Sequence, residues 1–128
     1  MDLFSGKIIG RNISNRHDVD LTMKAFEKAY FDRGEPEYVL FHSDRGSEYT
    51  ALTFRQMLER CNVVQSFSQK GYPYDNAPME RYFNTLKNEE IYLHHYHEEK
   101  ELYDAVEDFA YVKYNHVRPH AYNEYRTP

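Results

Sequence analysis

Two short apolar runs enclose a stretch with helical periodicity, and this order limits the possible folds more than any other feature. The runs are "YVLFH" at residues 38–42 and "VVQSFS" at residues 63–68. Between them, the segment "TALTFRQMLERC" at residues 50–61 predicts a helix with one buried face, because apolar residues recur in it at the i, i+3, i+4, i+7 spacing: Phe54, Met57, Leu58 and Cys61. A short continuous apolar run such as "YVLFH" suggests a strand covered on both faces. The order strand, helix, strand predicts an α/β fold.

The remaining elements extend this pattern. The segments "MDLF" and "KIIGRNI" are β-prone and flank Gly6, which can take a positive φ, so they predict a β-hairpin. A helix capped by Asp18 or Asp20 is expected to run to about Asp32. Further helices are expected at about 77–92 and 98–114, after a loop "QKGYPYDN". The inward residues are predicted to be Leu21, Ala25, Phe26, Ala29 and Tyr30 in the first helix, and Leu102, Val106, Phe109 and Ala110 in the last. The whole order predicts a mixed sheet flanked by helices.

Composition narrows the class of protein. At 128 residues the chain forms at most one ordinary domain, and its net charge of -5 argues against a generally basic nucleic-acid-binding surface. One cysteine excludes an internal disulfide framework and fits a reducing cytosol, and Cys61 is predicted to be a core residue. No apolar run approaches the ~20 residues that span a bilayer. We therefore expect a cytoplasmic protein that does not enter the membrane.

Asp44 follows the first apolar run directly, in "FHSDRGSEYT". Ligands of open α/β sheets gather at the carboxyl ends of parallel strands, which is where this carboxylate is expected to lie. The alternative is an aspartate that only forms the turn before Gly46. Spacing alone leaves both interpretations open.

Glu80 is the second candidate, in the predicted helix "DNAPMERYFNTLKNEE". At 100° per residue, the buried stripe of this helix is Met79, Tyr82, Phe83 and Leu86. Glu80 falls at the edge of the stripe, Lys87 points almost the same way two turns later, and Asn84 is close. The alternative is an ordinary solvated polar face.

Two carboxylates from different elements that meet at one strand end can hold a hard cation such as Mg²⁺, which prefers oxygen ligands. Such sites commonly serve phosphoryl chemistry, in which Lys87 would contact a phosphate as a point charge. The run "HHYH" at His94–His97 fits no closed zinc pattern and is predicted to be a solvated loop.

Four motifs, in order and with the expected gaps, resemble the catalytic core of DDE transposases from bacterial insertion sequences and, more distantly, retroviral integrases. They are "MDLFSGKIIG", "HSDRGSEYT", "KGYPYDNAPMERYFNTLKNEEIY" and "YNHVRPHAYNEYRTP", and they cover nearly the whole chain. The 35 residues between Asp44 and Glu80, at 45–79, match the interval between that family's second and third metal-binding carboxylates.

The resemblance implies a ribonuclease H-like fold, two Mg²⁺ or Mn²⁺ ions, and DNA strand cleavage and strand transfer in the bacterial cytoplasm. Asp44 and Glu80 would be catalytic metal ligands that meet at one end of the sheet. Lys87 matches a DNA-contacting position, and Arg81 and Asn84 are expected to contact DNA beside it. The partners implied are transposon-end and target DNA.

The sequence also departs from the family pattern. The family's first catalytic aspartate precedes the "DLFS" motif, and Asp2 matches a non-catalytic position, so we expect residues 1–128 to form a partial core without the first ligand, the central first strand and the helix-turn-helix region. Gly6 and Glu48 stand where the family often has arginine and glutamine, and Glu48 would weaken DNA binding modestly. Without a central strand the isolated chain is expected to be poorly soluble, molten or self-associated.

Three interpretations remain open from the sequence. The first is the C-terminal part of a transposase core, from an enzymatic family but expected to be inactive alone. The second is a non-catalytic remnant or inhibitory fragment that associates with full-length transposase. The third is an unrelated small α/β binding protein whose motifs are accidental, which Asp44 and Glu80 lying far apart would support.

Overall fold

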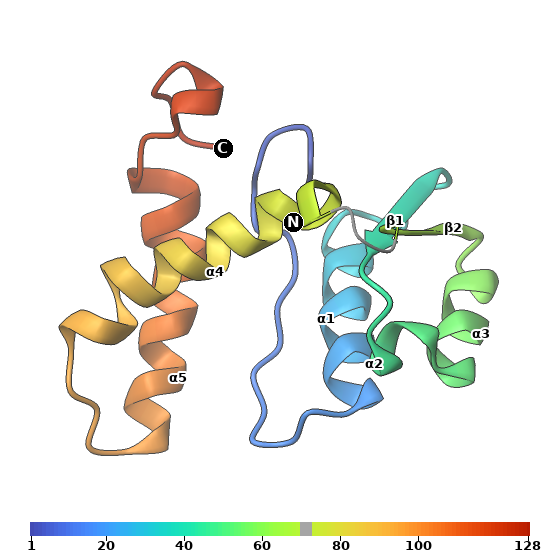
Figure 1. The fold of residues 1–128 in the computed structure, drawn as a ribbon, viewed down its shortest axis with the longest axis horizontal. Coiled ribbons are helices and arrows are strands. Elements are labelled where there is room, and N and C mark those ends of the chain that lie inside the picture. The colour runs from blue at the N-terminus through green and yellow to red at the C-terminus, as the bar shows by residue number, and fades with distance from the viewer. Residues whose placement is uncertain (70–72) are drawn as a thin grey trace. The chain divides into compact units, whose positions relative to one another are not determined.

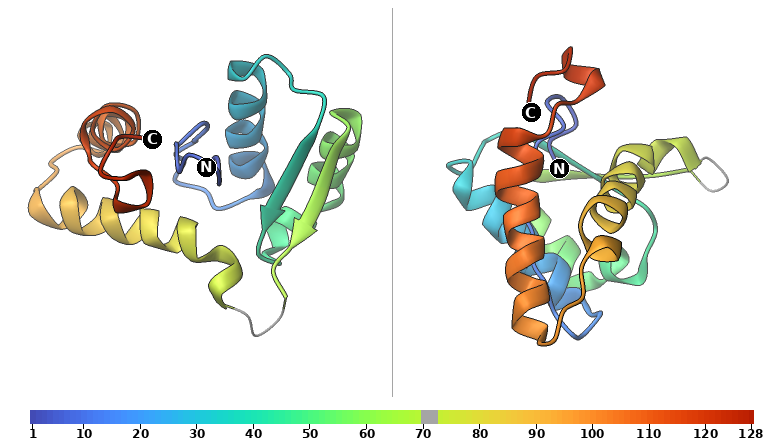
Figure 2. Two further views of the ribbon diagram at one scale, coloured as in Figure 1. Left: turned by 90° about the horizontal axis from the view of Figure 1, so that it is seen from above. Right: turned by 90° about the vertical axis from the view of Figure 1, so that its left-hand side faces the viewer.

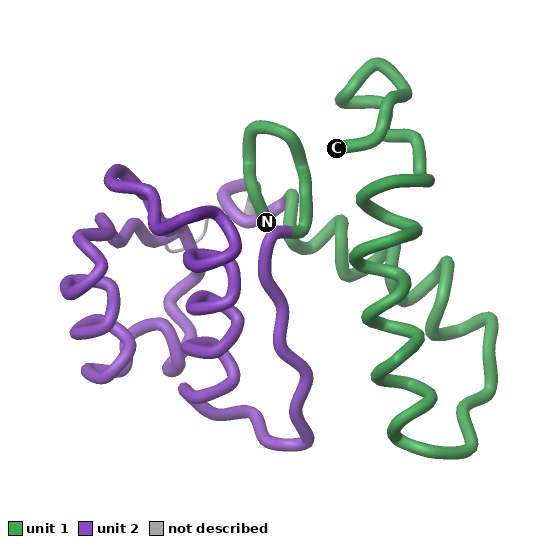
Figure 3. Tube along the Cα trace, turned by 180° about the vertical axis from the view of Figure 1, so that it is seen from behind, with its two compact units in different colours: residues 1–8, 78–128 green, residues 9–77 purple. Residues whose placement is uncertain are grey.

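The computed structural model describes residues 1–69 and 73–128, which form two compact units. Unit 1 combines Met1–Ile8 with Pro78–Pro128, and unit 2 is Ile9–Ala77 (Figure 3). Unit 1 is therefore built from two segments that are far apart in the sequence, whereas unit 2 is continuous.

Unit 2 contains the strand–helix–strand order that the sequence predicts. Its elements are α1 (Val19–Asp32), β1 (Val39–Ser43), α2 (Ser47–Thr50), α3 (Leu52–Arg60), β2 (Val63–Phe67) and the 3-10 helix η1 (Pro73–Asn76) (Figure 1). The strands pair in parallel, with Val39 beside Val63 and Ser43 beside Phe67 (Figure 2). The α/β class is confirmed, but the sheet of the described residues has two strands and is smaller than expected. Of the loop predicted at 69–76, residues 70–72 lie outside the described part of the chain.

The helices of unit 2 form as predicted, with one interruption. The carboxylate of Asp18 accepts a hydrogen bond from the backbone N–H of Leu21 at 3.1 Å, so Asp18 rather than Asp20 caps α1. The single helix expected at 50–61 is broken at Ala51, whose extended backbone (ψ 138°) separates α2 from α3.

The core of unit 2 is aromatic and centres on α1. Its buried residues are Phe26, Phe54, Met57, Leu58 and Val63. The Phe26 ring lies edge-on to the rings of Phe41 and Phe54, at centroid distances of 5.8 and 6.1 Å. Cys61 is partly buried and packs against this cluster, and burial raises the pKa of its thiol, so the prediction of a core cysteine is confirmed in part.

Gly10 lets the extended segment before α1 lie against that helix. A Cβ atom at Gly10 would collide with the carbonyl oxygen of Ala25 and lie 2.5 Å from the Cβ of Ala29. Glycine is therefore required at this position by close backbone approach.

One face of the two-stranded sheet is bare, so the prediction that "YVLFH" is covered on both faces is wrong. Phe41 and Val63 pack on the helices, but Leu40 is 67% exposed and its register partner Val64 is 63% exposed. The buried residues of α1 and α3 pack on the opposite face. Two apolar side chains consequently lie side by side in solvent.

Unit 1 is helical. It contains α4 (Ala77–Glu89, whose first residue belongs to unit 2), the 3-10 helix η2 (Ile91–Leu93), α5 (Glu99–Asp108), the π-helix η3 (Phe109–Val117) and the 3-10 helix η4 (Ala121–Asn123). Its core is Ile8, Tyr82, Leu86, Phe109, Ala110 and Tyr114. The helices predicted at 77–92 and 98–114 are confirmed, with the first ending earlier and the second continuing as η3. The prediction that Phe83 is inward is wrong, because it is 48% exposed, whereas Tyr82 and Leu86 are buried and Met79 is partly buried.

The hairpin predicted at the N-terminus is wrong, because residues 1–18 contain no strand. A turn does form at the expected place, where Gly6 has φ +79° and its N–H donates to the carbonyl of Asp2 at 2.9 Å. Beyond the turn, the backbone of Ile8 bonds to a side chain instead of a strand. The Asn115 amide accepts from Ile8 N–H and donates to Ile8 C=O, both at 2.9 Å. A buried asparagine thus replaces the β-ladder partner.

A buried carboxylate joins the end of α4 to η3. Glu90 is 4% exposed, and its carboxylate accepts hydrogen bonds from Lys113 Nζ at 2.6 Å and from the Tyr96 hydroxyl at 3.2 Å. The bond to Glu90 raises the pKa of Lys113. His94 is exposed, as predicted for this loop, yet its Nδ1 lies 3.3 Å from the same carboxylate. The "HHYH" segment therefore supports packing in unit 1.

Candidate metal and DNA site

Asp44 stands one residue beyond the carboxyl end of β1, as predicted. Its carboxylate oxygen Oδ1 accepts a hydrogen bond from the backbone N–H of Gly46 at 2.9 Å. Asp44 therefore forms the turn before Gly46, as the alternative interpretation predicts. This turn does not exclude a second role for the carboxylate. The other carboxylate oxygen, Oδ2, meets no hydrogen-bond donor among the residues that the structure describes, and the side chain is exposed.

A second carboxylate, that of Glu48, lies near Asp44. Burial is the main cause of the raised pKa of the Tyr49 hydroxyl, and the nearby carboxylates of Asp44 and Glu48 raise it further. Glu48, one of the departures from the family pattern, has its Oε1 3.5 Å from His17 Nε2.

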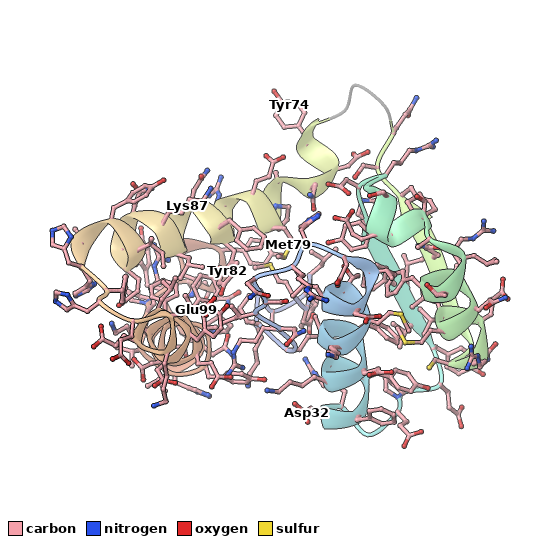
Figure 4. The ribbon with its side chains drawn as sticks, turned by 90° about the horizontal axis from the view of Figure 1, so that it is seen from below. Asp32, Tyr74, Met79, Tyr82, Lys87 and Glu99 are labelled. Atoms are coloured by element: carbon pink, nitrogen blue, oxygen red, sulfur yellow. The ribbon has the colours of Figure 1, made fainter. Side chains whose placement is uncertain are left out.

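Helix α4 presents a polar face that contains the other predicted site residues. Glu80, Arg81, Asn84 and Lys87 are all exposed. In Figure 4, Lys87 lies on the side of α4 away from α5, and Tyr82 lies on the side toward α5. Within the described chain, neither Glu80 nor Lys87 forms a hydrogen bond or ion pair through its side chain.

Residues that the sequence did not indicate hold this helix in place. Arg118, in the C-terminal motif, donates from Nε and Nη2 to the carboxylate of Glu89 at 2.8 Å, with a third contact at 3.1 Å. This bidentate pair lowers the pKa of Glu89. It joins the end of α4 to the segment after η3. The only sequence signal was the motif itself, which contains Arg118 but does not show its partner.

The donor chemistry of Asp44 and Glu80 fits a hard divalent cation, because both are exposed carboxylates with oxygen atoms not used in ion pairs of the described chain. Over residues 1–69 and 73–128, no group of three or more His, Cys, Asp or Glu side chains is gathered as a metal site. Asp44 belongs to unit 2 and Glu80 to unit 1, so their meeting at one ion stays a prediction.

Comparison with protein families shows which family the chain belongs to. A family model described as "Integrase core domain" matches residues 1–73, and a second model with the same description matches residues 62–128. Together the two matches cover every residue of the chain. The chain belongs to the integrase core family. This agrees with the ribonuclease H-like class that the motifs imply, to which the mixed α/β structure also corresponds.

Curated relatives of this integrase core chain are insertion-sequence proteins. The transposase for insertion sequence element IS904 of Lactococcus lactis is 33% identical over all 128 residues, which is 51% of that protein. The transposase InsF for insertion sequence IS3A of Escherichia coli is 34% identical over 95% of this chain and 42% of its own length. An uncharacterized 31 kDa protein of insertion element IS600 from Shigella sonnei is 33% identical over 94% of this chain. The predicted resemblance to insertion-sequence transposases is thereby confirmed.

The chain spans about half the length of the curated relatives it matches. Among the described helices, none is long and apolar enough to cross a membrane.

Proposed function

We propose that this chain supplies two metal-binding carboxylates, Asp44 and Glu80, to a transposase catalytic core that cleaves and joins DNA strands. Membership of the integrase core family along the whole chain carries this proposal. The structure supports it through one exposed carboxylate in each unit, neither of them in a described ion pair. When bound, Mg²⁺ or Mn²⁺ would activate the attacking oxygen and stabilise the leaving one.

The chain's own residues have separate tasks in this proposal. Asp44 and Glu80 bind the cation through their carboxylate oxygens. Lys87 contacts a DNA phosphate as a point charge, while Arg81 and Asn84 extend the contact along the exposed face of α4. Phosphate contacts position DNA without reading its sequence, so sequence recognition would come from other contacts.

Paramagnetic Mn²⁺ tests whether both carboxylates serve one site. Titration of the chain with Mn²⁺ should broaden the backbone amide signals of Gly46 and Arg81 together. Asp44→Asn and Glu80→Gln should each abolish the broadening at both positions, since each removes one ligand of a shared ion. Glu27→Gln, at an exposed position of α1, is the control and should change neither. Independent behaviour of the two signals would refute a shared site.

Catalysis by this chain alone is a separate question. We expect little or no Mg²⁺-dependent cleavage or strand transfer on transposon-end DNA, because two carboxylates leave a second metal ion short of ligands. Robust activity that Glu80→Gln abolishes would show that the two carboxylates suffice.

A second candidate function is that of a non-catalytic or inhibitory fragment that associates with full-length transposase. The bare sheet face with Leu40 and Val64 favours association, because paired apolar side chains in solvent promote contact with another chain. Co-expression with a related full-length transposase should then lower the transposition frequency, and Leu40→Lys should restore it. An unchanged frequency with the wild-type chain would exclude inhibition.

A further inference from the structure

The ends of the two strands carry a polar cluster that has no role in the proposed function. It consists of His42, Ser66 and Ser68. The His42 ring lies between two serine hydroxyls, with Nδ1 3.0 Å from Ser66 Oγ and Nε2 3.2 Å from Ser68 Oγ. His42 and Ser66 are direct register partners and so share one face of the sheet. The ring also reaches Ser68, which follows directly after the end of β2.

Ser68 connects this cluster to the backbone on both sides of Asp44. Its N–H and its hydroxyl both donate to the carbonyl oxygen of Ser43, at 2.8 and 3.3 Å. Its own carbonyl accepts a hydrogen bond from Arg45 Nε at 3.4 Å. The guanidinium carbon Cζ of Arg45 also lies over the Phe67 ring, 6.0 Å from the ring centroid. The residues before and after Asp44 are therefore both tied to the end of β2.

The donor and acceptor roles within the cluster depend on the tautomer of the His42 ring. If the Ser68 hydroxyl donates its single proton to Ser43 C=O, it accepts from an N–H at His42 Nε2. In that tautomer of the neutral ring, Nδ1 is an acceptor and receives the Ser66 hydroxyl proton. In either tautomer, the contacts join Ser66, His42 and Ser68 to the carbonyl that precedes Asp44.

We propose that His42 and Ser68 are positioning residues that fix the direction in which the Asp44 carboxylate projects. The carboxylate is itself held to the backbone by Gly46 N–H, so its direction is set by the backbone at residues 43–46. A carboxylate at an exposed strand end would otherwise sample many directions, and a site held in its productive geometry needs such supporting contacts. The value of this positioning for metal binding rests on the proposed function, but the positioning itself does not.

Amide dynamics of the metal-free protein test the positioning directly. In the wild type, the NMR order parameter of the Gly46 amide should be near the rigid value of about 0.85. Ser68→Ala removes the hydroxyl bonds to Ser43 C=O and His42 but keeps the backbone N–H bond to Ser43, so the order parameter should be lower than in the wild type without reaching that of a flexible loop. Ser68→Thr retains the hydroxyl and should restore rigidity. Ser66→Ala leaves the Ser68–Ser43 bonds in place and should have the smaller effect at Gly46, while altering the ring-nitrogen shifts of His42.

Two further measurements separate this proposal from the metal site. If Ser68→Ala does not fold, His42→Leu removes the ring nitrogens while keeping apolar volume, and Gly46 should lose rigidity in the same way. If Gly46 responds as expected but the wild type does not bind Mn²⁺, the positioning stands and the proposed metal site fails. If Gly46 stays rigid in folded Ser68→Ala and in His42→Leu, the positioning proposal is overturned.

Discussion

Replacing Asn115 by alanine should strongly destabilise unit 1. Asn115 is 0% exposed, and its amide makes both backbone hydrogen bonds of Ile8, which is itself buried. Asn115→Ala leaves the N–H and C=O of Ile8 without partners, at roughly 1–3 kcal/mol for each buried group. The combined loss of roughly 2–6 kcal/mol compares with a typical domain stability of about 5–15 kcal/mol.

Urea denaturation followed by circular dichroism measures this loss. Asn123→Ala is the matched control, because Asn123 is half-buried and donates one hydrogen bond, to Ser5 C=O at 2.8 Å. We expect it to lower the free energy of unfolding by about 1 kcal/mol. If Asn115→Ala costs no more than this control, the view that Asn115 replaces a strand partner is wrong.

Asn115→Asp refines the test, because it keeps an acceptor for Ile8 N–H and changes only the donor. At low pH the introduced carboxyl group keeps its proton and can donate to Ile8 C=O, whereas its ionised form would face that oxygen without a proton. Its folded-state pKa should therefore lie above the unfolded value of about 3.9. The stability it contributes is present below that value and is lost as the pH rises through the folded pKa. A variant with the wild-type pH dependence would contradict this assignment.

Four other outcomes are expected. Gly10→Ala should lower the stability of unit 2 by about 1–3 kcal/mol through overpacking, and equal unfolding midpoints would refute the close approach. The pKa of Glu89 is lowered, so its ion pair with Arg118 contributes folding stability at pH values above the unfolded pKa near 4.5. This stability is lost as the pH falls through the folded pKa of Glu89, and Arg118→Gln should therefore reduce the change of the unfolding free energy with pH in that range. Lys87→Ala should weaken DNA binding regardless of sequence and reduce the salt slope by about one unit, and an unchanged slope would remove it from the DNA path. Leu40→Lys should reduce self-association in sedimentation, unless the bare sheet face takes no part in it.

Helix faces, helix starts and the end of the first strand could be predicted from short stretches of the sequence. The spacing of Phe54, Met57 and Leu58 identified the buried face of α3, and Asp18, one of two candidate caps in the sequence, stands at the start of α1. Helix periodicity and capping act within a few residues, so both can be read locally. The apolar run before Asp44 correctly located the end of β1. Phe83 was misassigned because a helical wheel gives the direction of a side chain but not the width of the surface that covers it.

The unpredicted features depend on contacts between distant residues. Nothing near Asn115 in the sequence indicates that its amide meets Ile8, 107 residues away. The contact between His42 and Ser66 follows from the strand register, which is known only once the two strands are paired. Asp44 shows a different limit, because one side chain can form a turn with one oxygen and present the other outward, so the two interpretations were never exclusive.

The division of unit 1 into two segments has a consequence for synthesis on the ribosome. Unit 2 is continuous and its residues emerge together, so it can fold while the rest of the chain is still being made. The first eight residues must wait for Asn115, because their buried backbone has its partner there. A nascent chain released before that point would carry Asp44 in a completed unit and Glu80 in an unfinished one. Early termination of translation would therefore separate the two carboxylates into folded and unfolded parts of the same molecule.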